Sequence, residues 1–180
     1  MICLDKMEKG AIYVFINFMQ AARFGHVGWG FRLGEDRYCF GSSDHLWKHD
    51  WWDLPAWVRY MHVPAGGDID WWSEQGNKSD MLSMMKKGQH AAYKGRHIYY
   101  HAFKEIEFDL ASSSPEKALQ AAEQTNADGW HLSRNNCVHQ AYLIFSKYSS
   151  EHKLPNPFQD PLNLIPKTWF SRIESDEQLL

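Results

Sequence analysis

The stretch HLSRNNCVHQAYLIF, residues 131–145, decides how the rest of the chain is interpreted. A polar Ser-Arg-Asn-Asn run ends at Cys137, and an almost wholly apolar sequence follows. Asn135 or Asn136 is a good helix N-cap, so the pattern predicts a helix from Cys137 to about Lys147. Because apolar residues occupy all its sides, this helix is expected to lie buried at the centre of the fold.

The predicted position gives the Cys137 thiol a chemical advantage. The N-terminus of a helix carries the positive end of the backbone dipole and has N–H groups without intrahelical acceptors. A thiol there has a depressed pKa, and the same N–H groups can hold an oxyanion. The pattern therefore favours a nucleophile. The alternative is a small buried core residue, because free cysteine is among the residue types most often buried.

Length and composition indicate one globular domain, residues 1–180. Hydrophobic residues make up 44% and charged residues 23%, which excludes a disordered chain. The net charge of -3 argues against a nucleic-acid partner. The longest apolar stretch, AIYVFINFMQAA, is interrupted by Asn17 and Gln20, so no transmembrane segment is predicted.

The cysteines and the first residues indicate a cytoplasmic location. Cys3, Cys39 and Cys137 are odd in number and scattered, which argues against a disulfide framework and for a reducing compartment. No CxxC pair is present, so a structural zinc site is not expected. The opening MICLDKMEKG lacks the features of a secretory signal.

The first 42 residues predict an antiparallel meander. Residues 11–18, 25–33 and 37–42 have the β-branched and aromatic content of strands, and the sequence GED makes the second turn. Alternation in the second strand puts His26, Gly28 and Gly30 on one face and Val27, Trp29 and Phe31 on the other.

The middle of the chain, about 44–95, is predicted to be an insertion. Residues 43–75 hold six of the nine tryptophans and are interrupted by proline and glycine, which indicates short helices, a satellite core or one wall of a cleft. A helix is predicted over 78–95, capped by Ser79 or Asp80 and stopped near Gly88 or Gly95.

The remaining elements complete an α+β fold, with a central antiparallel sheet packed on helices. Residues 96–110 alternate as a strand. Residues 113–129 predict a helix with Ser114 as the cap and Pro115 at the first position. A short strand, WHLSR, precedes the cysteine helix, and the proline-rich tail is expected to be loop with a helical turn after Pro166.

A cysteine nucleophile needs a base, and ten histidines are candidates. His139 does not face Cys137, because positions i and i+2 lie on different sides of a helix. His131 precedes the helix and could lie near it, whereas His97 and His101 share one strand face and suit ordinary half-buried roles. His26 is the best candidate, because the glycines around it in GHVGWGF leave room for a substrate.

The order of these segments resembles the circularly permuted NlpC/P60 branch of the papain-like thiol hydrolases, a group that includes lecithin:retinol acyltransferase-like proteins. The matching segments are YVFINF, GHVGWGFRLGEDRYCFGS, SPEKALQAAEQTNADGWHLSRNNCVHQAYLIF and the proline-rich tail. A glycine-histidine strand precedes an asparagine-cysteine helix, as in the permuted order. The matches cover a little over half of the chain, and the insertion has no counterpart.

The resemblance implies that Cys137 is the nucleophile and His26 the base. The family usually has a third polar residue on the next strand, where this chain offers Ser42 in place of a carboxylate or histidine. Asp44 from the insertion is another possible orienting residue. Tyr13 and Asn136 are expected to help shape the oxyanion and substrate-binding site.

The expected reaction is acyl transfer from an amide or ester to water or an amine, through a thioester on Cys137. The substrate would be a small peptide, a cell-wall fragment, a γ-glutamyl amide or a lipid, and no metal or organic cofactor is required. Two alternatives stay open. One is a catalytically degenerate papain-like scaffold that binds a partner. The other is a metal-dependent hydrolase that uses His45 and His49, which are four positions apart.

Overall fold

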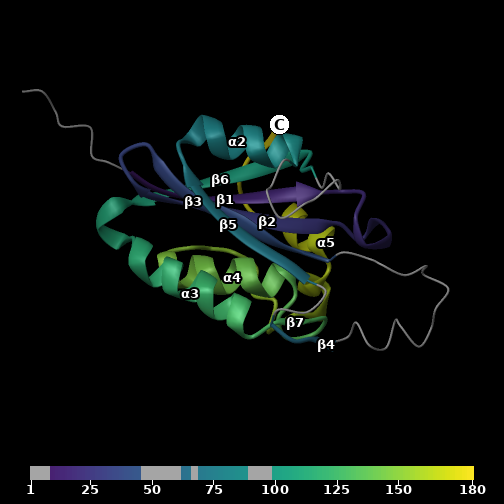
Figure 1. The fold of residues 1–180 in the computed structure, drawn as a ribbon. Helices are drawn as coiled ribbons and strands as arrows, with labels where there is room; N and C mark the ends of the chain where they lie inside the picture. The colour runs from purple at the N-terminus through teal and green to yellow at the C-terminus, as the bar shows by residue number, and fades with distance from the viewer. Residues whose placement is uncertain (1–8, 46–61, 66–68, 89–98) are drawn as a thin grey trace, which may run out of the picture.

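The computed structural model describes residues 9–45, 62–65, 69–88 and 99–180. One six-stranded antiparallel sheet organises them, with the strand order β5-β3-β2-β1-β6-β8. Helix α2 covers one face of this sheet, and α3, α4 and α5 cover the other (Figure 1). The α+β class and the central antiparallel sheet expected from the sequence are therefore confirmed.

The meander predicted for the first 42 residues is present. Strand β1 (Lys9–Asn17) pairs with β2 (His26–Gly34), and β2 pairs with β3 (Arg37–His45). The positive φ of Glu35, together with Gly34 at φ 155°, lets the chain reverse tightly between β2 and β3.

The predicted insertion contributes to the main sheet, which differs from the short helices expected for residues 43–75. Strand β5 (Ile69–Gly76) pairs with β3 along its whole length, and β4 (His62–Val63) pairs with β7 (Trp130–His131). The two tryptophans in β5 pack on opposite faces of the sheet, Trp71 toward the α4 side and Trp72 toward the α2 side, so neighbouring tryptophans here contact both apolar clusters. Residues 46–61, with the other four tryptophans of this segment, lie outside the described residues.

Helix α2 (Lys78–Lys87) is shorter than the helix predicted over 78–95. Its N-cap is Asn77, not Ser79 or Asp80, because Asn77 Oδ1 accepts from the Asp80 N–H at 2.8 Å while Asp80 returns a bond to the Asn77 N–H. Gly88 ends the helix in the left-handed conformation, as one of the two predicted stops.

The second half of the chain supplies the helical layer and the strands β6 and β8 at one side of the sheet. Strand β6 (Ala102–Asp109) pairs with β1, and the unpredicted β8 (Glu177–Leu179) pairs with the first residues of β6. Helix α3 (Pro115–Ala127) begins after Ser114, whose side chain makes no cap bond. Helix α4 (Cys137–Tyr148) begins at the predicted residue, and α5 (Pro166–Ser171) follows Pro166.

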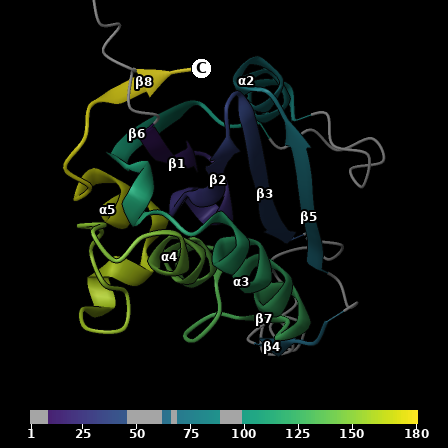
Figure 2. The ribbon, with the colours of Figure 1, turned by 90° about the vertical axis from the view of Figure 1, so that its left-hand side faces the viewer.

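The two faces of the sheet carry separate apolar clusters. The cluster beneath α3, α4 and α5 contains Val27, Trp29 and Cys137. The cluster beneath α2 contains Tyr13, Phe15, Tyr100 and Met81. In the end-on view of Figure 2 the helices α3 and α4 lie side by side under one face, with α2 above the other. The alternation predicted for β2 is confirmed, because Val27, Trp29 and Phe31 all belong to the α4 side.

Candidate functional site

Asn136 fixes the start of α4 with both ends of its amide. Its Oδ1 accepts from the Val138 N–H at 3.0 Å and from the His139 N–H at 3.1 Å. Its Nδ2 donates to the carbonyls of Leu132 at 3.0 Å and Leu164 at 3.4 Å. The side chain, predicted to be part of the oxyanion and substrate-binding site, is thus occupied in holding the helix terminus.

The capping bonds single out the Cys137 N–H. Asn136 Oδ1 takes two N–H groups of the first turn, the His139 ring accepts from the Asn136 N–H at 3.4 Å, and Gln140 N–H bonds to the Asn136 carbonyl. No acceptor for the Cys137 N–H occurs among the residues that the structure describes. That group is the one expected to hold an oxyanion.

Helix α4 and strand β2 lie so that Cys137 and His26 come to the same end of the sheet. At the far end the ring of Tyr148 contacts that of Phe31, with centroids 5.5 Å apart. The distance from Tyr148 back to Cys137 is roughly 16 Å along the helix axis. The distance from Phe31 back to His26 along the strand is also roughly 16 Å, so the two elements start at about the same level. Both elements are seen lengthwise in Figure 1.

A second, independent set of contacts joins the same two termini. Asn136 reaches the Leu164 carbonyl, and three residues later the Lys167 N–H donates to the Phe24 carbonyl at 3.1 Å. Phe24 lies two positions before His26. The segment that leads into α5 therefore links the start of α4 to the start of β2.

His26 belongs to a buried hydrogen-bonded group with Ser42 and Tyr100. His26 Nε2 lies 2.9 Å from Ser42 Oγ, the Tyr100 hydroxyl donates to Ser42 Oγ at 2.7 Å, and Ser42 donates to the Val27 carbonyl at 3.4 Å. One assignment satisfies all three bonds: Ser42 Oγ accepts from Tyr100 and from a protonated Nε2 of His26. His26 and Ser42 are therefore in contact, as the sequence led us to expect.

Tyr100 is a member of this group that the sequence analysis missed. It lies just before β6, in a tyrosine-rich segment that offered no signal beyond a strand. Its ring fills the space above Gly28, where a Cβ atom would come within 2.8 Å of it. Gly28 thus leaves room for Tyr100 to reach Ser42.

The sheet separates the histidine group from the cysteine. His26 shares the face of Gly28, Ser42 and Tyr100, which is the α2 side. Cys137 belongs to the cluster on the other face, which also contains Val27, the neighbour of His26. The two predicted catalytic groups are at one end of the sheet but approach it from opposite faces, so their pairing stays a prediction.

Tyr13 lies away from both groups. It pairs with Gly30, four positions along β2 from His26 and therefore roughly 13 Å from it. Its hydroxyl donates to Glu105, and Lys78 binds that carboxylate at 2.9 Å. Burial, followed by the bond to Glu105, raises the pKa of Tyr13. The structure does not bring Tyr13 to the predicted site, because it belongs to the middle of the opposite cluster.

The other candidate histidines have structural partners. His139 is buried in the capping box, and burial, with a smaller effect of His131, lowers its pKa to about 4. His131 accepts from the Ser133 N–H, and His101 accepts from the Phe18 N–H at 3.1 Å.

The metal alternative involves residues that lie outside the described part of the chain. The side chain of His45 and all of His49 and His97 lie outside the described residues, as does the side chain of Asp44. Among the side chains that are described, no group of three or more histidine, cysteine, aspartate or glutamate residues is placed to hold a metal ion.

Several buried polar atoms on the cysteine side of the sheet have no hydrogen-bond partner among the residues that the structure describes. They include Trp29 Nε1, Ser43 Oγ and Trp71 Nε1. Ser43 pairs with Trp71 across β3 and β5, and the two tryptophan rings lie 6.2 Å apart.

The second described cysteine differs from Cys137 in its chemistry. Cys39 is buried in β3, and burial, followed by the charge of Glu74, raises its pKa to about 12. Cys39 is therefore protonated and unreactive at neutral pH. Cys3 lies outside the described residues.

Comparisons of the chain with protein-family models, with curated proteins and with solved structures find no match. Within the described part of the chain, no helix is both long and apolar enough to cross a bilayer.

Proposed function

We propose that the chain is a cysteine-dependent hydrolase or acyltransferase that cleaves an amide or ester through a thioester on Cys137, with His26 as the base. The observation that carries the proposal is the start of α4. Cys137 occupies the first helical position, its N–H has no acceptor among the described residues, and the start of β2 lies at the same end of the sheet.

The reaction follows from these groups. His26 takes the thiol proton, and the Cys137 sulfur forms a bond to the substrate carbonyl carbon. The carbonyl oxygen becomes an oxyanion, which accepts from the Cys137 N–H. Collapse breaks the bond to the amine or alcohol, which leaves with the proton from His26. Water or an acceptor amine then attacks the thioester, and the sulfur regains a proton.

Ser42 and Tyr100 would replace the usual acidic orienting residue. Ser42 Oγ accepts a hydrogen bond from the Nε2–H group of His26. The other ring nitrogen, Nδ1, is therefore the one that would exchange a proton with the thiol. A hydroxyl is a weaker acceptor than a carboxylate and stabilises an imidazolium less. We therefore expect the general acid–base contribution at the lower end of the usual range, roughly 10²-fold.

A second candidate function is a binding protein whose catalytic site is degenerate. The observation that favours it is the separation of the two groups by the sheet, because His26 lies on the α2 side and Cys137 on the α4 side. In that case the histidine group would be a buried structural network.

Thiol alkylation distinguishes the two functions. Iodoacetamide is applied to the native protein across pH 5–9, and the modified peptides are quantified by mass spectrometry. The hydrolase predicts that Cys137 reacts at neutral pH well before Cys39. It also predicts that the His26→Ala variant raises the pH midpoint of Cys137 labelling, and that Ser42→Ala raises it less.

The matched control is His152→Ala, because His152 lies beyond the other end of α4 and bonds to Ser146. This variant should label like the wild type. A Cys137 labelling profile that is the same in the wild type, His26→Ala and His152→Ala would remove His26 as the base and favour the binding protein.

A further inference from the structure

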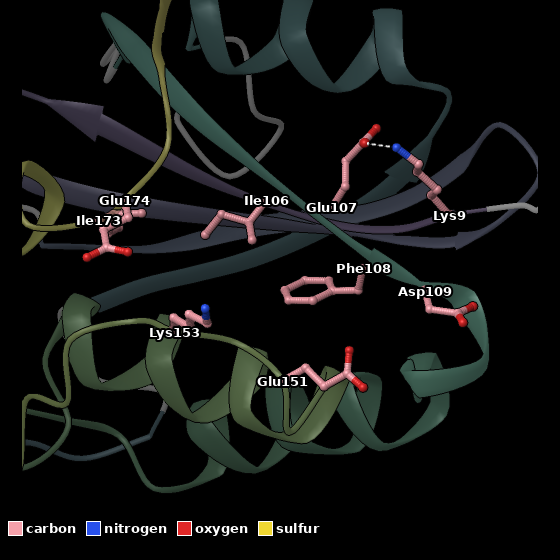
Figure 3. A pocket seen from close by; sticks show the side chains of 9 residues that line it. All are labelled: Lys9, Ile106, Glu107, Phe108, Asp109, Glu151, Lys153, Ile173 and Glu174. Atoms are coloured by element: carbon pink, nitrogen blue, oxygen red, sulfur yellow. Dashed lines mark hydrogen bonds and ion pairs between the residues drawn. The ribbon is translucent and has the colours of Figure 1, made fainter.

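A pocket of about 700 Å³ lies at the opposite end of the sheet from Cys137, beside strand β6. Figure 3 shows its floor, formed by Ile106 and Phe108 from β6, with Ile173 to one side and the loop that carries Glu151 and Lys153 below. Phe108 and Ile173 are almost completely buried, whereas the charged residues around them are exposed. The pocket therefore has an apolar floor and a charged rim.

The edge of β6 beside this pocket is open. Strand β8 pairs with Ala102, Phe103 and Lys104 and extends no further. The Leu180 N–H donates to the His101 carbonyl, so the odd-numbered residues of β6 direct their backbone groups outward. The Glu105 carbonyl is taken by the Ser175 hydroxyl at 2.6 Å.

Glu107 is the next outward residue along this edge. Its outward N–H and carbonyl have no partner within the described part of the chain. An open edge of this kind is a template for another strand.

The rim of the pocket is mainly acidic. Carboxylates come from Glu107, Asp109, Glu151 and Glu174, and Lys9 and Lys153 supply the positive charges. Lys9 is already paired with Glu107 at 2.5 Å. Glu151 is oriented by the Ser112 hydroxyl at 3.0 Å. Three carboxylates consequently face a single unpaired lysine among the lining residues.

We propose that this pocket and the open edge of β6 bind an extended, basic peptide segment of a partner protein. The backbone of the peptide pairs with Glu107, along the part of the β6 edge that β8 leaves open. A lysine or arginine side chain lays its apolar stem on Ile106 and Phe108 and brings its charge to Glu151 and Glu174. The site is independent of the thiol chemistry at the other end of α4.

The test is a titration of the full chain with the peptide acetyl-Thr-Lys-Thr-Lys-Thr-Lys-amide, followed by amide NMR. We expect the Glu107 amide to shift and its hydrogen exchange to slow on binding. Replacing each lysine of the peptide with norleucine keeps the stem and removes the charge, so binding should weaken roughly tenfold. A peptide with N-methylated threonines keeps the charge and loses the backbone donors, so protection at Glu107 should disappear.

Charge reversal in the protein completes the test. The double variant Glu151→Lys and Glu174→Lys should weaken binding roughly tenfold. The control, Glu116→Lys and Glu123→Lys, changes the net charge equally at exposed positions on α3 and should bind like the wild type. Equal binding of the lysine and norleucine peptides, equal effects of the two double variants, or a Glu107 amide that does not respond would each overturn the proposal.

Discussion

The stability of the protein should depend on the N-cap of α4. Asn136 is almost fully buried and holds the start of this helix through four hydrogen bonds. Replacing Asn136 with Ala removes an N-cap, which costs about 1–2 kcal/mol. It also leaves the Leu132 and Leu164 carbonyls without the amide donor, which costs about 1–3 kcal/mol. Together these effects predict a loss of about 2–5 kcal/mol of unfolding free energy.

The measurement is urea and thermal unfolding followed by circular dichroism. For a chain of this length, 1 kcal/mol corresponds to roughly 2–4 °C in melting temperature, so Asn136→Ala should melt roughly 4–20 °C lower. The Asn136→Asp variant keeps the acceptor for Val138 and His139 but loses both donated bonds, so it should lose about half as much.

The matched control is Asn126→Ala, because Asn126 is exposed on α3. Its stability should stay within about 0.5 kcal/mol of the wild type. If Asn136→Ala were as stable as Asn126→Ala, the reasoning that the amide fixes the start of α4 would be refuted. If Asn136→Asp were less stable than Asn136→Ala, the acceptor role assigned to Oδ1 would be wrong.

Two further predictions concern pH and packing. The pKa of about 4 for His139 lies below the unfolded value of about 6.5, so the unfolded state binds more protons between these pH values. The contribution of His139 to the unfolding free energy is therefore fully present above pH 6.5 and falls by up to about 1.4 kcal/mol per pH unit toward pH 4. The His139→Gln variant should lose this part of the acid sensitivity, as measured by urea unfolding at a series of pH values. At Gly41 an added Cβ would lie 2.2 Å from the Trp72 carbonyl oxygen, so Gly41→Ala should lose about 3 kcal/mol or more, because backbone must move. At Gly30 the closest atom to an added Cβ is the flexible end of Met81 at 2.8 Å, with Phe15 and Phe40 at 3.3 Å, so Gly30→Ala should lose less. Equal losses in calorimetry would contradict this explanation.

The elements with strong local signals were predicted from the sequence. Strand β1, strand β2 and the start of α4 at Cys137 follow from alternation, glycine placement and an asparagine cap, each of which acts within a few residues. The contact of His26 with Ser42 was also expected, because a hairpin places neighbouring strands in register.

Long-range pairing accounts for what the sequence did not predict. Strand β5 places its two adjacent tryptophans on opposite faces of the sheet, so they carried no alternation that marked a strand. The three-residue β8 is fully exposed and has no apolar pattern. Tyr100 reaches Ser42 across 58 positions, and only the pairing of β6 with β1 brings it there.

The central place of β1 in the sheet has a consequence for synthesis of the chain. Its two neighbours are β2, which follows within a few residues, and β6, which begins at Ala102. A nascent polypeptide emerging from the ribosome can form the β1–β2 hairpin early, but the other side of β1 stays exposed until Asp109 has been made. During that interval the unpaired backbone edge of an apolar strand is available for pairing with other chains. We therefore expect fragments that end before residue 102 to aggregate, and expression of the whole chain to benefit from holdase chaperones.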